Sequence, residues 1–176
     1  MCLGLFFKSL KRKWGEFRVN KLYAGTRCFE KKRKIMIGLG FEIGEGTKIV
    51  GPIYCTGKLT VGKQCWLGTG LTVHGNGNVV IGDCCDIAPE AAFLTGGHAI
   101  GNNERRAGEG ETYRITVGDG VWIGARATLM KDITIGDGAV IAACAAVASD
   151  VEANTIVGGV PAKPIQRLDK DGNKLE

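Results

Sequence analysis

A six-residue period runs through most of this 176-residue chain and constrains its fold more than any other feature. Mostly apolar residues occupy the first position of successive hexads, and glycine often occupies the second. A period of six is neither the helical 3.6 nor a plain strand alternation, and it marks a parallel β-helix. The first positions are Ile37, Ile43, Ile49, Cys55, Val61, Leu67, Val73, Ile81, Ile87, Phe93, Val117, Ile123, Leu129, Ile135, Ile141 and Val147.

Each hexad is expected to form one short strand and one turn, with three hexads in each triangular coil. The first residue should point inward, and the second-position glycine should accommodate the backbone angles of the corner. The fifth position should also face the narrow interior, because its residues are small or β-branched: Thr47, Cys65, Cys85, Ala91, Val121, Ala127, Ala139 and Ala145. A solenoid needs covers at both ends. We therefore expect a basic N-terminal arm (1–36), a β-helix (37–160) and a C-terminal tail (161–176).

The net charge of +5 is unevenly distributed along the chain. Residues 1–36 carry 11 Lys and Arg against two Glu, and the remaining 140 residues carry 12 against 16 Asp and Glu. A nucleic-acid-binding protein would need a basic face on the fold itself. We therefore expect no nucleic-acid partner.

Apolar residues precede the basic ones in the N-terminal arm, which is the reverse of a secretory signal. No stretch approaches the ~20 apolar residues that span a bilayer. The arm could lie in a membrane interface or pack on the first coil, and apolar spacings of three and four favour the cover. We expect a cytoplasmic protein, with weak peripheral contact at the inner face of the membrane as the alternative. The residues concerned are Leu3, Leu5, Phe6, Phe7, Leu10, Trp14 and Phe17, beside Lys8, Lys11, Arg12 and Lys13.

Seven cysteines occur without any CxxC spacing, and the chain has only two histidines. This pattern suggests neither a zinc site nor a disulfide framework, and a reducing compartment fits it best. We expect no bound metal.

The repeat stops between His98 and Ile115, where a glycine-rich, charged segment replaces the hexads. We expect residues 99–114 to form an extruded loop, and loops on a rigid scaffold often carry function. His98 is expected at the base of this loop, at the end of the last regular strand. Its side chain suits a general base because the ordinary histidine pKa lies near neutrality. His74 has no such placement, so we expect a corner or surface role for it.

Three stretches resemble the hexapeptide-repeat acetyltransferases of the maltose, galactoside and nodulation-sugar branch. They are TGGH ending at His98, VGDGVWIGARATL at 117–129 and VGGVPAKPI at 157–165. The resemblance implies an all-β, left-handed parallel β-helix and a homotrimer with active sites between subunits. It also implies transfer of an acetyl group from acetyl-CoA to a hydroxyl.

On the donor side, the resemblance implies that His98 deprotonates the acceptor hydroxyl while that hydroxyl attacks the thioester, so no acyl-enzyme is needed. The backbone N–H for the developing oxyanion falls on Ala125, and Trp122 would line the pantetheine or acceptor channel. Ser149 stands where the family often has lysine, whereas Lys163 could still pair with a CoA phosphate. The full set expected to contact acetyl-CoA is Trp122, Gly124, Ala125, Ala143, Ala148, Ser149, Lys163 and Arg167.

The acceptor side departs from the family. Tyr54 and Asn76 stand where galactoside acetyltransferases have polar acceptor contacts, and a family asparagine falls on Gly68. Glu109 matches a family glutamate. Arg105, with the adjacent arginine, would suit a charged or polyhydroxylated acceptor. The identity of the acceptor therefore does not transfer from the family.

The favoured function is O-acetylation of a sugar, in a surface polysaccharide or lipid-linked glycan. Serine O-acetyltransferase is the nearest alternative, although 36 residues are too few for its long helical N-terminal domain. A zinc hydratase needs three histidine ligands, and this sequence has two histidines. A nucleotide-sugar N-acetyltransferase would begin with a βα unit, and the sequence shows no pattern of that kind. A non-catalytic β-helix scaffold is the alternative of a different class, and the extruded loop with His98 argues against it.

Overall fold

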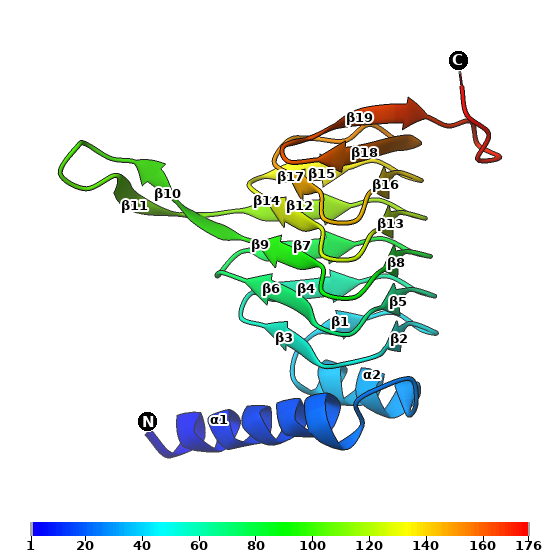
Figure 1. Ribbon diagram of the computed structural model, residues 1–176. Helices are drawn as coiled ribbons and strands as arrows, with labels where there is room; N and C mark the ends of the chain where they lie inside the picture. Colours follow the sequence, from blue (N-terminus) through cyan, green and yellow to red (C-terminus); the bar gives the residue numbers. More distant parts are fainter. Residues whose placement is uncertain (1, 176) are drawn as a thin grey trace.

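The computed structural model describes residues 2–175, with side chains from residue 9 onward, as a β-solenoid that follows a helical N-terminal arm (Figure 1). The arm comprises α1 (Cys2–Phe17), the π-helical turn η1 (Arg18–Leu22) and α2 (Phe29–Gly38). The expectations for Leu3, Leu5, Phe6, Phe7 and Lys8 concern side chains outside the described part. No helix in the described residues is long and apolar enough to cross a bilayer.

Three sheets form the sides of the solenoid, and each coil adds one strand to each sheet. Sheet A contains β1 (Glu42–Ile43), β4 (Lys58–Val61), β7 (Asn78–Ile81), β12 (Arg114–Val117) and β15 (Ile133–Ile135). Sheet B contains β2 (Lys48–Ile49), β5 (Trp66–Leu67), β8 (Asp86–Ile87), β13 (Trp122–Ile123), β16 (Val140–Ile141), β18 (Thr155–Gly159) and β19 (Ala162–Arg167). Sheet C contains β3 (Ile53–Cys55), β6 (Leu71–His74), β9 (Ala92–Leu94), β14 (Thr128–Met130) and β17 (Ala146–Val147).

The predicted inward positions form the core. From Ile43 to Val147 every first-position residue is buried except Cys55, which is half-buried, and all the predicted fifth-position residues are buried. Parallel pairing keeps the register from coil to coil, so that Ile49 lies beside Leu67 and Leu67 beside Ile87. The six-residue period therefore predicted both the fold and its core.

The second-position glycines are required for a different reason from the one expected. None of them has a positive φ. A Cβ on Gly62 would instead lie 2.5 Å from the carbonyl oxygen of Gly82 in the next coil. The left-handed backbone occurs at the fourth position, for example at Gln64 (φ 56°) and Gly120 (φ 64°). Close approach between coils, not the corner angle, excludes a side chain at the second position.

The solenoid begins later than the repeat suggested. Ile37, expected as the first inward residue, lies in α2 and is 43% exposed, and the first strand starts at Glu42. At the other end β19 pairs antiparallel with β18, so the expected boundary at residue 160 falls within a hairpin. The segment expected as a tail covers the last coil.

The N-terminal arm covers the first coil through buried polar contacts. Val19 is fully buried, and the Asn20 side chain accepts from the N–H of Ile53 and donates to its carbonyl, both at 2.9 Å. The fully buried Lys32 ammonium donates to the carbonyls of Gly25 (2.6 Å) and Val50 (2.9 Å). Burial lowers the pKa of Lys32 because it penalises the charged form.

The segment expected as an extruded loop forms an antiparallel β-hairpin. It consists of β10 (Gly96–Ile100) and β11 (Ala107–Thr112), inserted between β9 and β12. Figure 1 shows this hairpin extending away from the stacked coils. The break in the repeat predicted the extrusion, and the pairing of the two strands became visible only in the structure.

Candidate active site

His98 lies on the hairpin itself, not at the end of the last regular strand as expected. β9 ends at Leu94, and His98 is the third residue of β10, opposite Gly110. A register shift follows between the His98 and Ile100 pairs. The bulge leaves the carbonyl of Gly108 free to meet the imidazole, with 2.9 Å between Nδ1 and the oxygen.

This contact determines the tautomer of His98. A carbonyl oxygen only accepts hydrogen bonds, so Nδ1 is the donor and carries the hydrogen of the neutral ring. Nε2 is then left with a lone pair on an exposed side chain. A neutral imidazole oriented in this way can take a proton from a hydroxyl that approaches Nε2.

Thr95 anchors the base of the hairpin to the coil below. It is fully buried, and its hydroxyl donates to the carbonyl of His74 (3.0 Å) and accepts from the N–H of Gly77 (3.2 Å). Its carbonyl accepts from the N–H of Tyr113 (2.9 Å), where the chain returns from the hairpin. His74 is exposed and contributes its backbone here, in keeping with a corner residue.

The corners of the solenoid differ in what their backbone N–H groups meet. Where sheet A turns into sheet B, carboxylates from the next coil accept from them: Asp83 from the N–H of Lys63 (2.6 Å), and Asp119 from that of Asp83 (2.7 Å). At the turn from sheet B to sheet C, none of the described residues accepts from the N–H of Ala125 or Ala143. The half-buried Ala125 therefore offers an N–H to an oxygen from outside the chain.

Neighbouring residues hold Ala125 close to the next coil. A Cβ on Gly124 would lie 2.5 Å from the nitrogen of Ala143, so only glycine fits without displacing backbone. The carbonyl of Ala125 accepts from the N–H of Cys144 at 2.9 Å. Trp122 is 57% exposed on the outer face of sheet B, paired in register with Val140.

The outer face of sheet C carries a column of small side chains in register: Thr72, Ala92, Thr128 and Ala146. This face separates the two groups of residues expected to contact the acyl donor. Ala125 and Ala143 lie at its edge with sheet B, whereas Ala148 and Ser149 follow β17 at its edge with sheet A. An extended ligand lying across sheet C would reach both groups.

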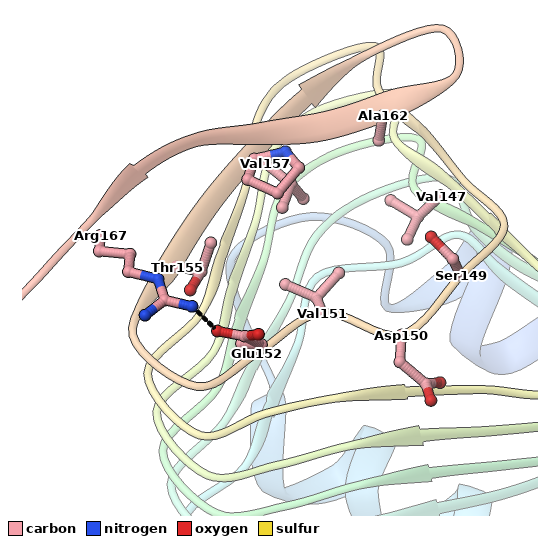
Figure 2. A pocket seen from close by; sticks show the side chains of 10 residues that line it. Val147, Ser149, Asp150, Val151, Glu152, Thr155, Val157, Ala162 and Arg167 are labelled. Carbon is pink, nitrogen blue, oxygen red and sulfur yellow. Dashed lines mark hydrogen bonds and ion pairs between the residues drawn. The ribbon is translucent and has the colours of Figure 1, made fainter.

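The two basic candidates on β19 differ. Lys163 is exposed. Arg167 forms an ion pair with Glu152, drawn in Figure 2, and this pair reduces the availability of Arg167 for a phosphate. The cavity in Figure 2 also includes Ser149 and the apolar Val157 and has a volume of about 170 Å³. The buried Val147, Val151 and Val157 line this cavity, so it is the end of the solenoid interior. Its volume is too small for CoA, because ligand sites usually measure about 300–1,000 Å³.

The acceptor candidates are dispersed. Arg105 and Glu109 are exposed on the hairpin with His98, and the exposed Asn76 lies at the corner below the hairpin base. Tyr54 is half-exposed on β3, two coils below β9. Gly68 is buried, and a Cβ there would lie 2.7 Å from the backbone of Ala88, so the position has no room for the family asparagine.

One chain does not assemble the whole set. In Figure 1 the hairpin with His98 leaves the solenoid near β9, on the side opposite β13 and β16. Ala125 directly follows β13 and therefore lies away from His98 in the same chain.

Sequence reasoning missed one pair beside Ala125. The Arg126 guanidinium lies 2.6 Å from the Glu90 carboxylate, which raises the pKa of Arg126. Both residues hold the fourth hexad position of successive coils, so the repeat register could have revealed the pair. Among the described residues there is no group of three or more His, Cys, Asp or Glu side chains that could hold a metal ion.

Comparison with known proteins gives consistent results. A family model described as "Bacterial transferase hexapeptide (six repeats)" matches residues 114–149. Galactoside O-acetyltransferase of Escherichia coli (strain K12) is 30% identical over 174 residues, covering 97% of this chain and 85% of the relative.

Two solved structures are also similar. Galactoside acetyltransferase in complex with coenzyme A superposes with a TM-score of 0.79 at 27% identity, covering 97% of this chain and 86% of that one. The polySia specific acetyltransferase NeuO gives a TM-score of 0.62 at 30% identity, covering 71% and 55%. The chain belongs to the hexapeptide-repeat acetyltransferase family.

Proposed function

We propose that this protein transfers an acetyl group from acetyl-CoA to a sugar hydroxyl, in a surface polysaccharide or a lipid-linked glycan, with His98 as the general base. Membership of the family makes the chain an acetyl-CoA-dependent acetyltransferase. The acceptor and the mechanism are the proposal. The hydrogen bond between His98 Nδ1 and the Gly108 carbonyl carries it, because this bond leaves Nε2 basic and exposed.

In the proposed reaction Nε2 of His98 takes the hydroxyl proton while the sugar oxygen attacks the thioester carbonyl. The oxygen–carbon bond forms, and the carbonyl oxygen gains a negative charge that the N–H of Ala125 stabilises. The carbon–sulfur bond then breaks, and the imidazolium returns its proton to the CoA thiolate. Holding both substrates together supplies much of the rate, so no acyl-enzyme is required.

We further propose a homotrimer in which His98 of one subunit meets Ala125 of the next. The separation of these residues within one chain supports this arrangement. The hairpin supports it too: Ile100 is 89% exposed, and an isolated two-stranded hairpin is at best marginally stable in water. A cyclic threefold assembly would cover Ile100 and complete the site.

The acetyl-CoA is proposed to lie across the outer face of sheet C. Its carbonyl end would reach Ala125, backbone groups at Ala143, Ala148 and Ser149 would contact its middle, and Lys163 would meet a phosphate. The small side chains of that face support this path. The similar galactoside acetyltransferase was solved in complex with coenzyme A, which supports the donor.

Two observations support a sugar acceptor. The similar proteins include one named for galactosides and one named for polySia. Arg105 and Glu109, exposed on the same hairpin as His98, provide a cation and an anion for a polyhydroxylated or charged acceptor. We propose a cytoplasmic location, where acetyl-CoA is available.

A panel of acceptors tests this function. CoA release and alkali-labile acetyl esters are measured with galactosides, with charged and neutral oligosaccharides, and with serine. We expect ester formation on a saccharide, at a rate at least a hundredfold lower with the His98→Ala variant. Turnover of serine above that of every saccharide would refute the sugar acceptor and favour serine O-acetylation.

A further inference from the structure

Helix α1 has two faces with different surroundings. On one face the Arg12 guanidinium donates to the carbonyl of Cys55 (2.8 Å), and Gly15 lies against the side chain of Leu39. This face covers the solenoid. The sequence suggested that the arm is either a cover or an interfacial helix. In the structure these two roles belong to different faces of α1, so they do not exclude each other.

The other face of α1 is apolar and exposed. Leu10, Trp14 and Phe17 are 47%, 60% and 50% exposed, and the rings of Trp14 and Phe17 stack with 5.6 Å between their centroids. At about 100° per residue these three positions lie roughly half a turn from Arg12 and Gly15. The apolar stripe, defined as Leu10, Trp14 and Phe17, therefore points away from the solenoid.

A basic groove lies beside the stripe, between α1 and α2. Its cations are Lys11, Arg18, Lys31 and Lys34, and among the residues whose side chains the structure describes no acidic one lines it. The Arg18 guanidinium and the Lys31 ammonium both lie close to the ring of Tyr23, at 5.7 and 5.8 Å from its centroid. Lys34 has an exposed ionic partner in Glu30 at 3.7 Å, and exposed pairs of this kind contribute little.

We propose that the N-terminal arm docks the protein peripherally on an anionic lipid bilayer. The apolar stripe enters the interface, and the basic groove receives the phosphates of the headgroups. Tryptophan, phenylalanine and leucine on one face with cations beside them are the composition of helices that lie in a membrane surface.

The distribution of charge and shape favours a lipid surface over an acidic protein. The basic residues concentrate at one end of the molecule, 11 against two Glu in residues 1–36, whereas the rest of the chain is mildly acidic. Figure 1 shows α1 lying across that end, beyond the first coil and α2, so a flat surface can reach it without meeting the solenoid. The stripe lines a shallow, open, mostly apolar hollow together with Lys13, which adds a cation beside it. This inference does not depend on the proposed acceptor or on catalysis.

Vesicle binding by the full-length protein tests the proposal. Sedimentation is measured with vesicles of phosphatidylcholine alone and of phosphatidylcholine mixed with phosphatidylglycerol, at low and high salt. We expect binding only to the anionic vesicles, and at least tenfold weaker binding at high salt, because the attraction of basic residues to the surface is screened. Equal sedimentation with both kinds of vesicle, or none, would overturn the proposal.

Matched variants locate the contact. Trp14→Glu with Phe17→Glu, and separately Lys31→Glu with Lys34→Glu, should each weaken binding at least tenfold. Val160→Glu, at a residue that is 77% exposed at the far end of the molecule, should leave binding unchanged. Lys170→Glu with Lys174→Glu should also leave it unchanged, although this variant alters the net charge as much as Lys31→Glu with Lys34→Glu. Thermal unfolding checks that each variant is folded. If the Trp14/Phe17 variant binds vesicles like wild type, or if it changes the oligomeric state while wild type ignores vesicles, the stripe is no membrane contact.

Discussion

The coils and the β10–β11 hairpin differ in how far their side chains are buried. Within a coil the inward side chains are fully buried, as Phe93 is in β9. From Gly96 to Arg114, none of the residues is buried, and Ile100, seven residues after Phe93, is 89% exposed. The coils provide the stability, and the hairpin holds a polar side chain in solvent on a stable base. The buried residues of the coils therefore stabilise the fold, whereas the residue that we propose reacts lies on the exposed hairpin.

The two regions also use their polar groups differently. In the coils Asp83 and Asp119 satisfy backbone N–H groups of their neighbours, so their carboxylates serve the architecture. In the hairpin the Gly108 carbonyl satisfies only one nitrogen of His98 and leaves the other available. A substitution in a coil should therefore act on stability, and one in the hairpin on chemistry.

The largest expected effect is that of His98→Ala on turnover. Removing a general base should lower kcat by two to four orders of magnitude, with acetyl-CoA affinity and the unfolding temperature nearly unchanged. His74→Ala, on an exposed residue of a coil, is the control and should keep its activity. A His98→Ala enzyme with more than a tenth of the wild-type rate at saturating acceptor would place the base elsewhere.

Phe93→Ala tests the coil side of the comparison. Emptying this fully buried position should lower the free energy of unfolding by about 3–5 kcal/mol, measured by urea denaturation. Tyr54→Ala removes another aromatic ring, one that is half-exposed on the outer face of the same sheet, and should cost less than about 1 kcal/mol. Equal losses would show that the coils are not stabilised mainly by their interior.

Ile100→Asp tests whether the exposed hairpin is covered by a neighbouring subunit. An unpaired carboxylate in the proposed interface should weaken trimer formation by about two orders of magnitude, seen by light scattering across a concentration series. Activity should fall with the loss of trimer. An unchanged trimer would mean that Ile100 lies outside the interface, and an active monomer would contradict the shared site.

Thr95→Val tests the connection between the two regions. The substitution keeps the shape but leaves the N–H of Gly77 without its acceptor, which should cost about 1–3 kcal/mol of stability. Because Thr95 anchors the hairpin, kcat should fall while the KM for acetyl-CoA stays the same. Thr116→Val, on the outer face of β12, is the matched control. A loss of stability without any loss of kcat would mean that the hairpin holds His98 without this anchor.

The smallest expected effect lies at the donor end. Lys163→Glu should weaken acetyl-CoA about tenfold, and dephospho-acetyl-CoA less, if Lys163 meets the 3′-phosphate. Arg167→Gln should have a smaller effect because Glu152 already engages that guanidinium. Binding of both ligands is measured by calorimetry. Equal losses for the two ligands with Lys163→Glu would assign the lysine to another part of CoA, and a larger loss with Arg167→Gln would reverse the assignment.

The coils could be predicted from the sequence almost residue by residue. Each inward residue meets its equivalent one coil later, as the N–H of Cys65 meets the hydroxyl of Thr47, 18 residues earlier. A period of six repeated three times gives this spacing of 18 residues. The two extra residues after Val73 lengthen the spacing to 20, as between Val61 and Ile81, without changing which residues face inward. The prediction failed at Ile37, where a helix takes over from the repeat and no further coil lies below.

The site depended on contacts that no period encodes. The bulge that brings the Gly108 carbonyl to His98 arises from how two strands pair, and the engagement of Arg167 by Glu152 arises from how the last hairpin folds back. The sequence by itself determined the solenoid, its interior and the place where it is interrupted. Only the tertiary structure decided the tautomer of His98, the ionic partner of Arg167 and the free face of α1, because each depends on groups brought together from segments with no fixed spacing.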